Sequence, residues 1–477
     1  MHETEAPKKT AVIAAVQLPN TGDDEHKGNI AELRRLLETL GYEVVGFVSQ
    51  KRHGLGAGAI FGAGKLVELA AYTGGTGIVP SSAPNAGKKG KDAEDDEDEG
   101  DEGEGEAVDE ADAAEDRADD RAIVAPPHPD GAYPHADVVV IDHEISPRQA
   151  RNLEKATEAE VIDRTGVIVE IFHRHANTRE ARLQVEIARL SYVVPRLRAG
   201  VRGSDRQRGG IGGKGAGESS LELDRRKVRD RVAELKAELA SIAREEDTRR
   251  SRRQGVRRVA LVGYTNAGKS SLMRALTGSE VLVEDKLFAT LGTTVRALNP
   301  EVVPRILVSD TVGFIKKLPH DLVASFRSTL EEAKEASLLL HVVDASDPEM
   351  RRQLEVTRTV LGEIGADQAP SRLILNKVDK VDEAGRAALA VEFPDAIQLS
   401  AKDPDDVGRL HEAIVGFFEA DFDEVTLVVP YAQGALTGVI RQSVRVLAEK
   451  FEEDGTHLLV RAPRAEIARL QGLLDAN

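Results

Sequence analysis

The stretch "RVALVGYTNAGKSSLMRALTG", residues 258–278, decides the fold of the second half of this chain. An apolar strand pattern leads into G-x-x-x-x-G-K-[ST], which ends at Lys269 and Ser270, and a helix pattern follows. Backbone N–H groups of such a loop surround phosphates at a helix N-terminus, while Lys269 reaches the β- and γ-phosphates and Ser270 binds Mg²⁺. The stretch therefore predicts a phosphate-binding loop. Its expected nucleotide contacts are Gly263, Tyr264, Thr265, Asn266, Ala267, Gly268, Lys269 and Ser270.

Two more phosphate-site motifs come after this loop. Asp310 follows the strand pattern "RILVS" and begins "DTVG", so we expect it to hold Mg²⁺ through water, with the Gly313 N–H near the γ-phosphate. The segment "LFATLGTT" offers Thr290 as a second Mg²⁺ ligand in a mobile switch loop. The expected metal ligands are Ser270, Thr290 and Asp310, and the expected catalytic residues are Lys269, Thr290 and Gly313. Further nucleotide contacts are expected at Phe288, Ala289, Thr290, Leu291, Gly292, Asp310, Thr311, Val312 and Gly313.

The motif "NKVD" at 376–379 ends another apolar strand pattern and predicts which base is bound. A carboxylate at Asp379 accepts hydrogen bonds from guanine N1 and N2, a donor pair that adenine lacks. Asn376 is expected to support the loop, and Lys377 to pack along the base. The motif "SAK" adds a backbone donor to guanine O6. These motifs select GTP over ATP, with contacts expected at Asn376, Lys377, Val378, Asp379, Ser400, Ala401 and Lys402.

Phe314 stands directly after Gly313, where Ras-like GTPases carry a glutamine that orients the attacking water. A phenylalanine side chain has no polar atom for that task. We therefore expect slow intrinsic hydrolysis of GTP to GDP and phosphate, with a partner improving water positioning or stabilising the transition-state charge. An ordinary core position for Phe314 is compatible with this reading.

Composition bounds the class of protein. The 477 residues suffice for about three domains, and the absence of cysteine excludes disulfides and thiolate metal sites. The apolar run "AVIAAV" near the N-terminus is too short for a signal peptide, and no stretch of roughly 18 apolar residues occurs. We expect a soluble, cytoplasmic protein without a membrane span, and a monomer by default.

The net charge of −18 is unevenly distributed. Residues 92–120 hold 18 Asp/Glu and one Arg, whereas residues 174–258 hold 23 Lys/Arg against 12 Asp/Glu. The acidic run cannot bury enough apolar surface to offset ordering entropy, so we expect a disordered insert over 81–135. A solvated loop extension is the simplest reading of this insert; a halophilic-type adaptation and a shield against nucleic acids are the alternatives. A nucleic-acid partner is expected at the basic segment.

Two apolar stripes with alternating spacings of four and three residues occur in the basic segment and predict an antiparallel helical hairpin. The stripes are Leu183, Ile187, Leu190, Val194 and Leu197, and Val228, Val232, Leu235, Leu239 and Ile242. The connection "RQRGGIGGKGAGESSLELDRR", residues 206–226, contains G-x-G-x-x-G, but no strand precedes it, so it is no dinucleotide fingerprint. A flexible linker is one reading. Its arginines favour contact with RNA phosphates instead, and the expected RNA-binding residues are Arg206, Arg208, Lys214, Arg225 and Arg226.

The pattern along the chain predicts an α/β protein of four parts. An N-terminal α/β domain over 1–178 precedes the helical hairpin of 179–257, and a P-loop GTPase domain over 258–420 follows. Residues 421–477 read as a small α+β domain, in which we expect a single helix over 434–451.

Together these motifs resemble the HflX family of GTPases over nearly the whole chain, except the acidic insert and, more loosely, the C-terminal part. The resemblance is carried by "EISPRQARNLEKA", "VIDRTGVIVEIFHRHANTREARLQVEIARL" and "GGIGGKGAGESSLELDRR". The family's form of the last motif is close to GGxGxxGPGETQLExDRR, so Ala216 replaces a proline and Ser219–Ser220 replace Thr-Gln. In the switch, "FATLGTT" stands in place of the family's FATLDPT, so Thr290 is retained and Gly292 replaces an aspartate.

The resemblance implies a GTPase that binds the large ribosomal subunit and its rRNA, and that splits or rescues ribosomes, with the hairpin loop pointing toward the peptidyl-transferase region. It also implies some ATP hydrolysis beside a preference for guanine. A ribosome-assembly GTPase is one alternative. The other is a non-catalytic RNA-binding anti-association factor that nucleotide merely stabilises.

Overall fold

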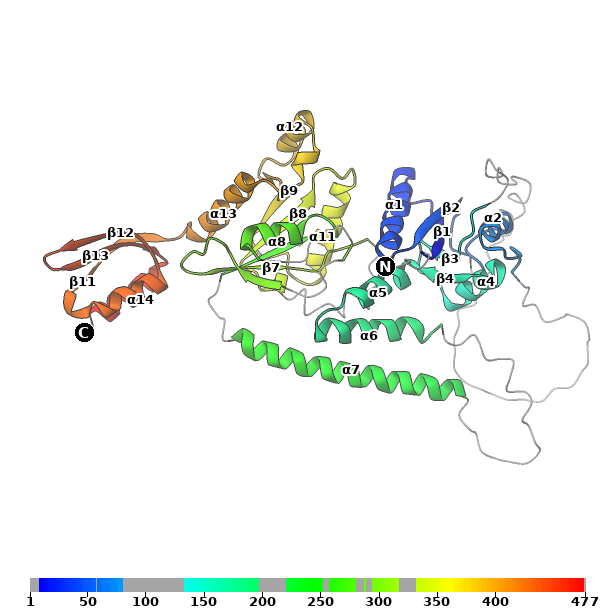
Figure 1. Cartoon of the computed structure of the whole chain (residues 1–477), viewed down its shortest axis with the longest axis horizontal. Coiled ribbons are helices and arrows are strands. Elements are labelled where there is room, and N and C mark those ends of the chain that lie inside the picture. The colour runs from blue at the N-terminus through cyan, green and yellow to red at the C-terminus, as the bar shows by residue number, and fades with distance from the viewer. Residues whose placement is uncertain are drawn as a thin grey trace, which may run out of the picture. The chain divides into compact units, whose positions relative to one another are not determined.

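The computed structural model describes residues 8–56, 58–79, 133–196, 220–251, 257–279, 287–288, 294–316 and 332–475. These residues form three β-sheets with their covering helices (Figure 1), which confirms the mixed α/β class. The chain divides into two compact units. One comprises Met1–Ile171 and Arg189–Arg225, and the other Phe172–Ala188 and Arg226–Asn477. Most of the acidic insert lies outside the described residues.

The N-terminal unit is built on a four-stranded parallel sheet of order β2-β1-β3-β4. Its strands are β1 (Thr10–Gln17), β2 (Glu43–Lys51), β3 (Val138–Ile141) and β4 (Glu160–Asp163), and its helices include α1 (Asp23–Thr39), α2 (Ala63–Thr73) and α4 (Pro147–Thr157). β1 is buried over almost its whole length, as expected for a central strand covered on both faces. Leu66 and Leu69 of α2 and Leu153 of α4 pack into one core with the strands.

The "SPRQ" motif of the N-terminal unit is a helix start. Ser146 Oγ accepts a hydrogen bond from the Gln149 N–H (3.2 Å), and Gln149 Oε1 accepts one from the Ser146 N–H (2.8 Å), which forms a capping box at α4. Gln149 Nε2 also donates to Gly56 O (2.9 Å). The motif therefore starts α4 and holds the glycine-rich turn after β2.

Asp163, at the end of β4, joins three segments of the N-terminal unit. Its fully buried carboxylate accepts hydrogen bonds from Tyr192 Oη (2.8 Å), Arg196 Nη2 (2.6 Å) and the Gly166 N–H (2.9 Å). The Arg196 guanidinium also lies 3.6 Å from the centre of the Tyr192 ring. Burial and the negative charge of Asp163 raise the pKa of Tyr192, which stays a neutral donor. The residues that precede the glycine-rich connection are thereby held to the sheet.

Three helices lead from the first sheet to the second: α5 (Arg164–His175), α6 (Arg179–Val193) and α7 (Ser220–Ser251). Arg179 of α6 pairs with Glu238 of α7 (2.6 Å), and Glu186 pairs with Arg231 (3.0 Å). Because the earlier residue of α6 meets the later residue of α7, the two helices run antiparallel, as the apolar stripes predict. Leu183 and Ile187 of the first stripe and Leu235 of the second are buried.

The nucleotide-binding region is a six-stranded sheet of order β10-β9-β8-β5-β7-β6. Its strands are β5 (Arg257–Gly263), β6 (Thr294–Ala297), β7 (Ile306–Asp310), β8 (Leu338–Asp344), β9 (Ser371–Asn376) and β10 (Ile397–Gln398). Helices α8 (Lys269–Thr277) and α13 (Pro404–Glu419) pack on one face, and α11 (Met350–Glu363) and α12 (Glu383–Glu392) on the other. All strand pairs are parallel except β6 with β7, an antiparallel edge that the sequence patterns did not predict.

The C-terminal part is an antiparallel sheet of order β11-β13-β12 with two helices. Its elements are β11 (Asp423–Val429), α14 (Ala435–Ser443), β12 (Arg445–Glu452), β13 (Gly455–Ala462) and α15 (Arg464–Asp475). The single helix expected over 434–451 is wrong in its second half, because α14 ends at Ser443 and β12 follows. The hairpin with β13 gives the backbone of Arg445–Glu452 its hydrogen-bond partners and thereby outweighs local helix preference.

Candidate nucleotide-binding site

The phosphate loop connects β5 to α8 in the way that the sequence predicts. Gly268 is the N-cap of α8, with φ +93°, and a Cβ at this position would lie 2.2 Å from Asn376 Nδ2. Only glycine combines this left-handed backbone with so close an approach. The loop therefore opens at the helix N-terminus, where backbone N–H groups favour anions.

Lys269 is buried, and its ammonium lies inside the phosphate loop. Nζ donates to Gly263 O (3.0 Å) and Tyr264 O (2.9 Å). Burial lowers the pKa of Lys269 to about 8, although the nearby carboxylate of Asp310 opposes the shift. A phosphate group would supply the negative charge that such a desolvated ammonium lacks.

Ser270 and Asp310, two of the residues predicted to bind a divalent cation, lie side by side. Ser270 Oγ donates to Asp310 Oδ2 at 2.7 Å, although the residues come from α8 and β7. Asp310 is fully buried at the carboxyl end of its strand. A hydroxyl and a carboxylate oxygen are hard donors of the kind that Mg²⁺ prefers, so this pair fits the predicted ion.

The "DTVGF" segment lies directly against the phosphate loop. The Thr265 N–H donates to Phe314 O (2.8 Å), and the Phe314 N–H donates to Gly263 O (3.1 Å). A Cβ on Gly313 would approach Thr265 Cγ2 to 2.8 Å and Lys269 Nζ to 3.1 Å. Gly313 is thus held beside the lysine that is expected to contact the γ-phosphate. The Phe314 side chain is buried, so it packs and offers no polar group to a water molecule.

The base motif is linked to the phosphate loop by two side chains. Asn376 Nδ2 donates to Ala267 O (2.9 Å), and Lys377 Nζ donates to Asn266 O (2.7 Å). Ser400 Oγ donates to Asp379 Oδ1 (2.8 Å), which orients the carboxylate expected to read guanine. Residues of four predicted motifs therefore meet at the carboxyl ends of parallel strands, where open α/β sheets bind ligands.

Two carboxylates at this site were missed by the motifs. Asp344 ends β8, and its Oδ2 lies 2.8 Å from Lys377 Nζ. Asp406 Oδ2 accepts a hydrogen bond from the Ser400 N–H (2.7 Å), which holds the "SAK" loop. The signal for Asp344 is an acidic residue at the carboxyl end of a buried strand. Asp406 has no comparable signal.

Other predicted site residues make different contacts or lie outside the described residues. Phe288 is buried, and its ring stacks edge to face on Phe172 with centroids 4.5 Å apart. Of the RNA-binding set, Arg225 and Arg226 belong to α7, and the side chain of Arg226 is exposed. The other members of the two sets lie outside the described residues: Ala289, Thr290, Leu291, Gly292, Arg206, Arg208 and Lys214.

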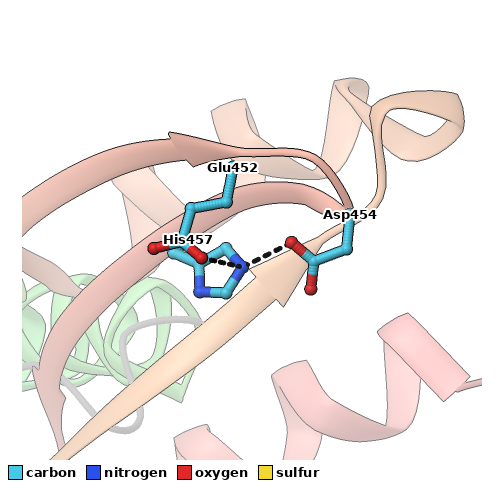
Figure 2. Close-up of side chains that lie close together, drawn as sticks. All are labelled: Glu452, Asp454 and His457. Carbon is cyan, nitrogen blue, oxygen red and sulfur yellow. Dashed lines mark hydrogen bonds and ion pairs between the residues drawn. The ribbon is translucent and has the colours of Figure 1, made fainter.

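A separate group of possible metal ligands lies at the turn between β12 and β13 (Figure 2). His457 Nε2 is 2.8 Å from Asp454 Oδ1 and 3.9 Å from Glu452 Oε2. The hydrogen bond from His457 lowers the pKa of Asp454. These contacts are those of a surface ion-pair cluster that closes the hairpin, and we assign no metal to it.

The phosphate loop, the predicted cation ligands beside it and the base motif are those of P-loop GTPases. Three family models match the chain in agreement with this class. They are described as GTP-binding GTPase N-terminal (residues 131–173), GTP-binding GTPase Middle Region (175–253) and 50S ribosome-binding GTPase (258–377).

Relatives identify the family more closely. A GTPase HflX of Gluconacetobacter diazotrophicus is 60% identical over 476 residues, and the match covers 100% of both chains. The GTPase HflX of Escherichia coli is 42% identical over 340 residues, which cover 70% of this chain and 80% of that one. This chain therefore belongs to the HflX family of GTPases.

Among solved structures, a GTP-binding protein from the archaeon Sulfolobus solfataricus in complex with GDP matches 85% of this chain and 99% of its own. The sequence identity is 21% and the TM-score 0.39. Within the described part of the chain, no helix combines the length and the apolar character that crossing a membrane requires.

Proposed function

We propose that this chain is a GTP-dependent switch that binds the large ribosomal subunit in the cytoplasm and splits or rescues ribosomes. Bound Mg²⁺ would neutralise charge on the β- and γ-phosphates, with Ser270 and Asp310 as ligands and Thr290 as a third ligand predicted from sequence. Lys269 would bind the same phosphates, and the Gly313 N–H would meet the γ-phosphate. Loss of the γ-phosphate on hydrolysis would then release both switch segments, the loop of Thr290 and the loop of Asp310 and Gly313.

Slow turnover without a partner is part of the proposal. The observation behind it is the packing of Phe314, whose buried side chain cannot orient an attacking water. Phosphoryl transfer needs that water in line with the leaving group, so a partner has to supply the missing alignment or charge stabilisation. The ribosome is the partner that the 50S ribosome-binding family description favours.

The antiparallel hairpin carries the proposed contact with rRNA. The first described turns of α7 expose Arg226, Lys227 and Arg229. The connection that precedes this helix adds Arg206, Arg208 and Lys214. Guanidinium and ammonium groups at this density suit RNA phosphates and would make binding strongly salt-dependent.

GTP turnover with and without large ribosomal subunits tests the switch. We expect stimulation by subunits on the order of tenfold or more, and loss of turnover in Lys269→Ala. Absence of stimulation, together with unchanged turnover in Lys269→Ala, would refute the proposal. Joint replacement of Arg206, Arg208 and Lys214 by alanine is expected to weaken subunit binding and its salt dependence and to leave GTP affinity intact.

Sedimentation of mature ribosomes with a non-hydrolysable GTP analogue separates the candidate roles. A splitting factor yields free subunits under these conditions. A ribosome-assembly GTPase would bind precursor particles and leave mature ribosomes intact. An anti-association factor that nucleotide merely stabilises would act equally well when Lys269→Ala abolishes hydrolysis.

A further inference from the structure

Asp344 lies beside the base motif without belonging to it. It is the last residue of β8, and it pairs in register with Asn376 of β9. Its Oδ2 lies 2.8 Å from Lys377 Nζ, and the two side chains are 15% and 19% exposed. Water therefore screens this ion pair less than it screens the surface pairs of the chain.

The carboxylate of Asp344 has a fixed orientation. Its other oxygen, Oδ1, accepts hydrogen bonds from Ser346 Oγ (2.6 Å) and from the Ser346 N–H (3.0 Å). Burial by itself would raise the pKa of Asp344, but the hydrogen bonds from Lys377 and Ser346 outweigh it and lower this pKa. Asp344 is thus a charged acceptor whose position is set before Lys377 meets it.

Lys377 is held at both ends of its side chain. Its backbone is left-handed, with φ 63°, which is uncommon for a residue other than glycine. Its Nζ donates to Asn266 O in the phosphate loop at 2.7 Å while it contacts Asp344. A lysine stem with several rotatable bonds is therefore confined to one path between the two acceptors, and the entropy of ordering it is lost before ligand binding.

We propose that Asp344 is a positioning residue of the guanine site, which holds the Lys377 ammonium so that the lysine stem is already placed for the base to pack on. The proposal rests on the assignment of Lys377 to the guanine site. Asp344 contacts Lys377 and not the base. Its effect should therefore appear in nucleotide affinity and pass through Lys377.

A double-mutant cycle on the full-length protein tests whether Asp344 acts through Lys377, with the dissociation constant of GDP as the readout. We expect Asp344→Asn to weaken GDP binding about three- to tenfold, the range for one charge-assisted hydrogen bond. In the Lys377→Met background, which keeps the apolar stem and removes the ammonium, Asp344→Asn is expected to change affinity less than about twofold. Glu392→Gln, which removes the charge from a carboxylate paired with Arg351, is the matched control and is expected to leave GDP affinity unchanged.

Inorganic pyrophosphate serves as a second probe, because it fills the phosphate loop without a base. Asp344→Asn is expected to leave pyrophosphate affinity within about twofold, whereas general damage to the site would lower both affinities. An equal loss of GDP affinity in both Lys377 backgrounds, or a matching loss for pyrophosphate, would overturn the proposal.

A further variant distinguishes failure of this proposal from failure of the site assignment. If Lys377→Ala, which removes the stem as well as the ammonium, leaves GDP affinity unchanged, the assignment of Lys377 to the guanine site is wrong. If Lys377→Ala weakens GDP binding and Asp344→Asn does not, only the role of Asp344 is wrong. Should Asp344→Asn not fold, Ser346→Ala takes its place in the same cycle, since it removes one of the two hydrogen bonds that orient the Asp344 carboxylate. A loss of GDP affinity that persists in the Lys377→Met background would again overturn the proposal.

Discussion

Gly268→Ala is expected to damage the nucleotide site in two ways: by straining the backbone and by displacing Asn376. A control variant measures the two effects separately. The left-handed backbone of Gly268 costs an alanine about 1–2 kcal/mol. The new Cβ would also lie 2.2 Å from Asn376 Nδ2, so Asn376 has to move. It would lose its hydrogen bonds to Ala267 O (2.9 Å) and from the Ala401 N–H (3.1 Å). At about 0.5–1.5 kcal/mol each, these bring the total cost to roughly 2–5 kcal/mol.

Gly365→Ala is the matched control. Gly365 lies in the same nucleotide-binding region with φ +71°, and a Cβ there would meet nothing within 4 Å. Its substitution therefore carries the backbone strain of about 1–2 kcal/mol without the displacement of Asn376. The difference between the two variants, about 1–3 kcal/mol, measures the displaced asparagine.

The assay is urea unfolding of the full-length protein, read at the transition that GDP shifts, since ligand binding stabilises only the region that binds it. GDP affinity is measured in parallel and is expected to fall in Gly268→Ala and to stay unchanged in Gly365→Ala. Equal losses of stability in both variants, with GDP affinity intact in Gly268→Ala, would refute the reasoning.

Three further predictions concern single side chains. Bound phosphates are expected to raise the pKa of Lys269 from its value of about 8, so GDP binding takes up a proton above that pH. GDP affinity should therefore fall by up to about tenfold per pH unit as the pH rises past about 8. In Lys269→Met it should not change over the same range. Ser270→Ala removes one of the two proposed Mg²⁺ ligands that lie side by side, and titrations of GTP with and without Mg²⁺ are expected to show that most of the gain in affinity from Mg²⁺, about tenfold or more, has disappeared. Asp163→Ala leaves Arg196 without its buried carboxylate, and the unfolding transition that GDP does not shift is expected to lose about 3–5 kcal/mol; a loss below about 1 kcal/mol would contradict the buried role.

Sequence patterns predict the nucleotide-binding sheet well because its central strands are buried on both faces. Runs such as "LLLHVVD" have no polar face and cannot be stable outside a covered sheet. The site residues Lys269, Asp310 and Asn376 lie at or shortly after the carboxyl ends of such strands. Those ends share one edge of the sheet, so the sheet topology alone brings these residues close together. The edge strand β6 cannot be predicted in this way, because its four residues, TVRA, do not form an apolar run.

Other features depend on contacts that a linear pattern does not contain. The apolar residues over 434–451 fit a helical spacing, and only pairing with β13 makes Arg445–Glu452 a strand. Asp344 is a single carboxylate in the sequence, and it gains a role only because β8 and β9 are neighbours. Asp406 acts from the first turn of α13 on a loop that precedes it, which no spacing rule anticipates.

The division of the chain into two units limits how proteolysis or recombination can separate them. The boundary between the units is crossed after Ile171, after Ala188 and after Arg225, so α6 contributes its first part to one unit and its last part to the other. No single cleavage can therefore release one unit free of residues of the other and leave both complete. A protease that cuts once, or a recombination event with one breakpoint, therefore divides at least one of the two units between the two pieces.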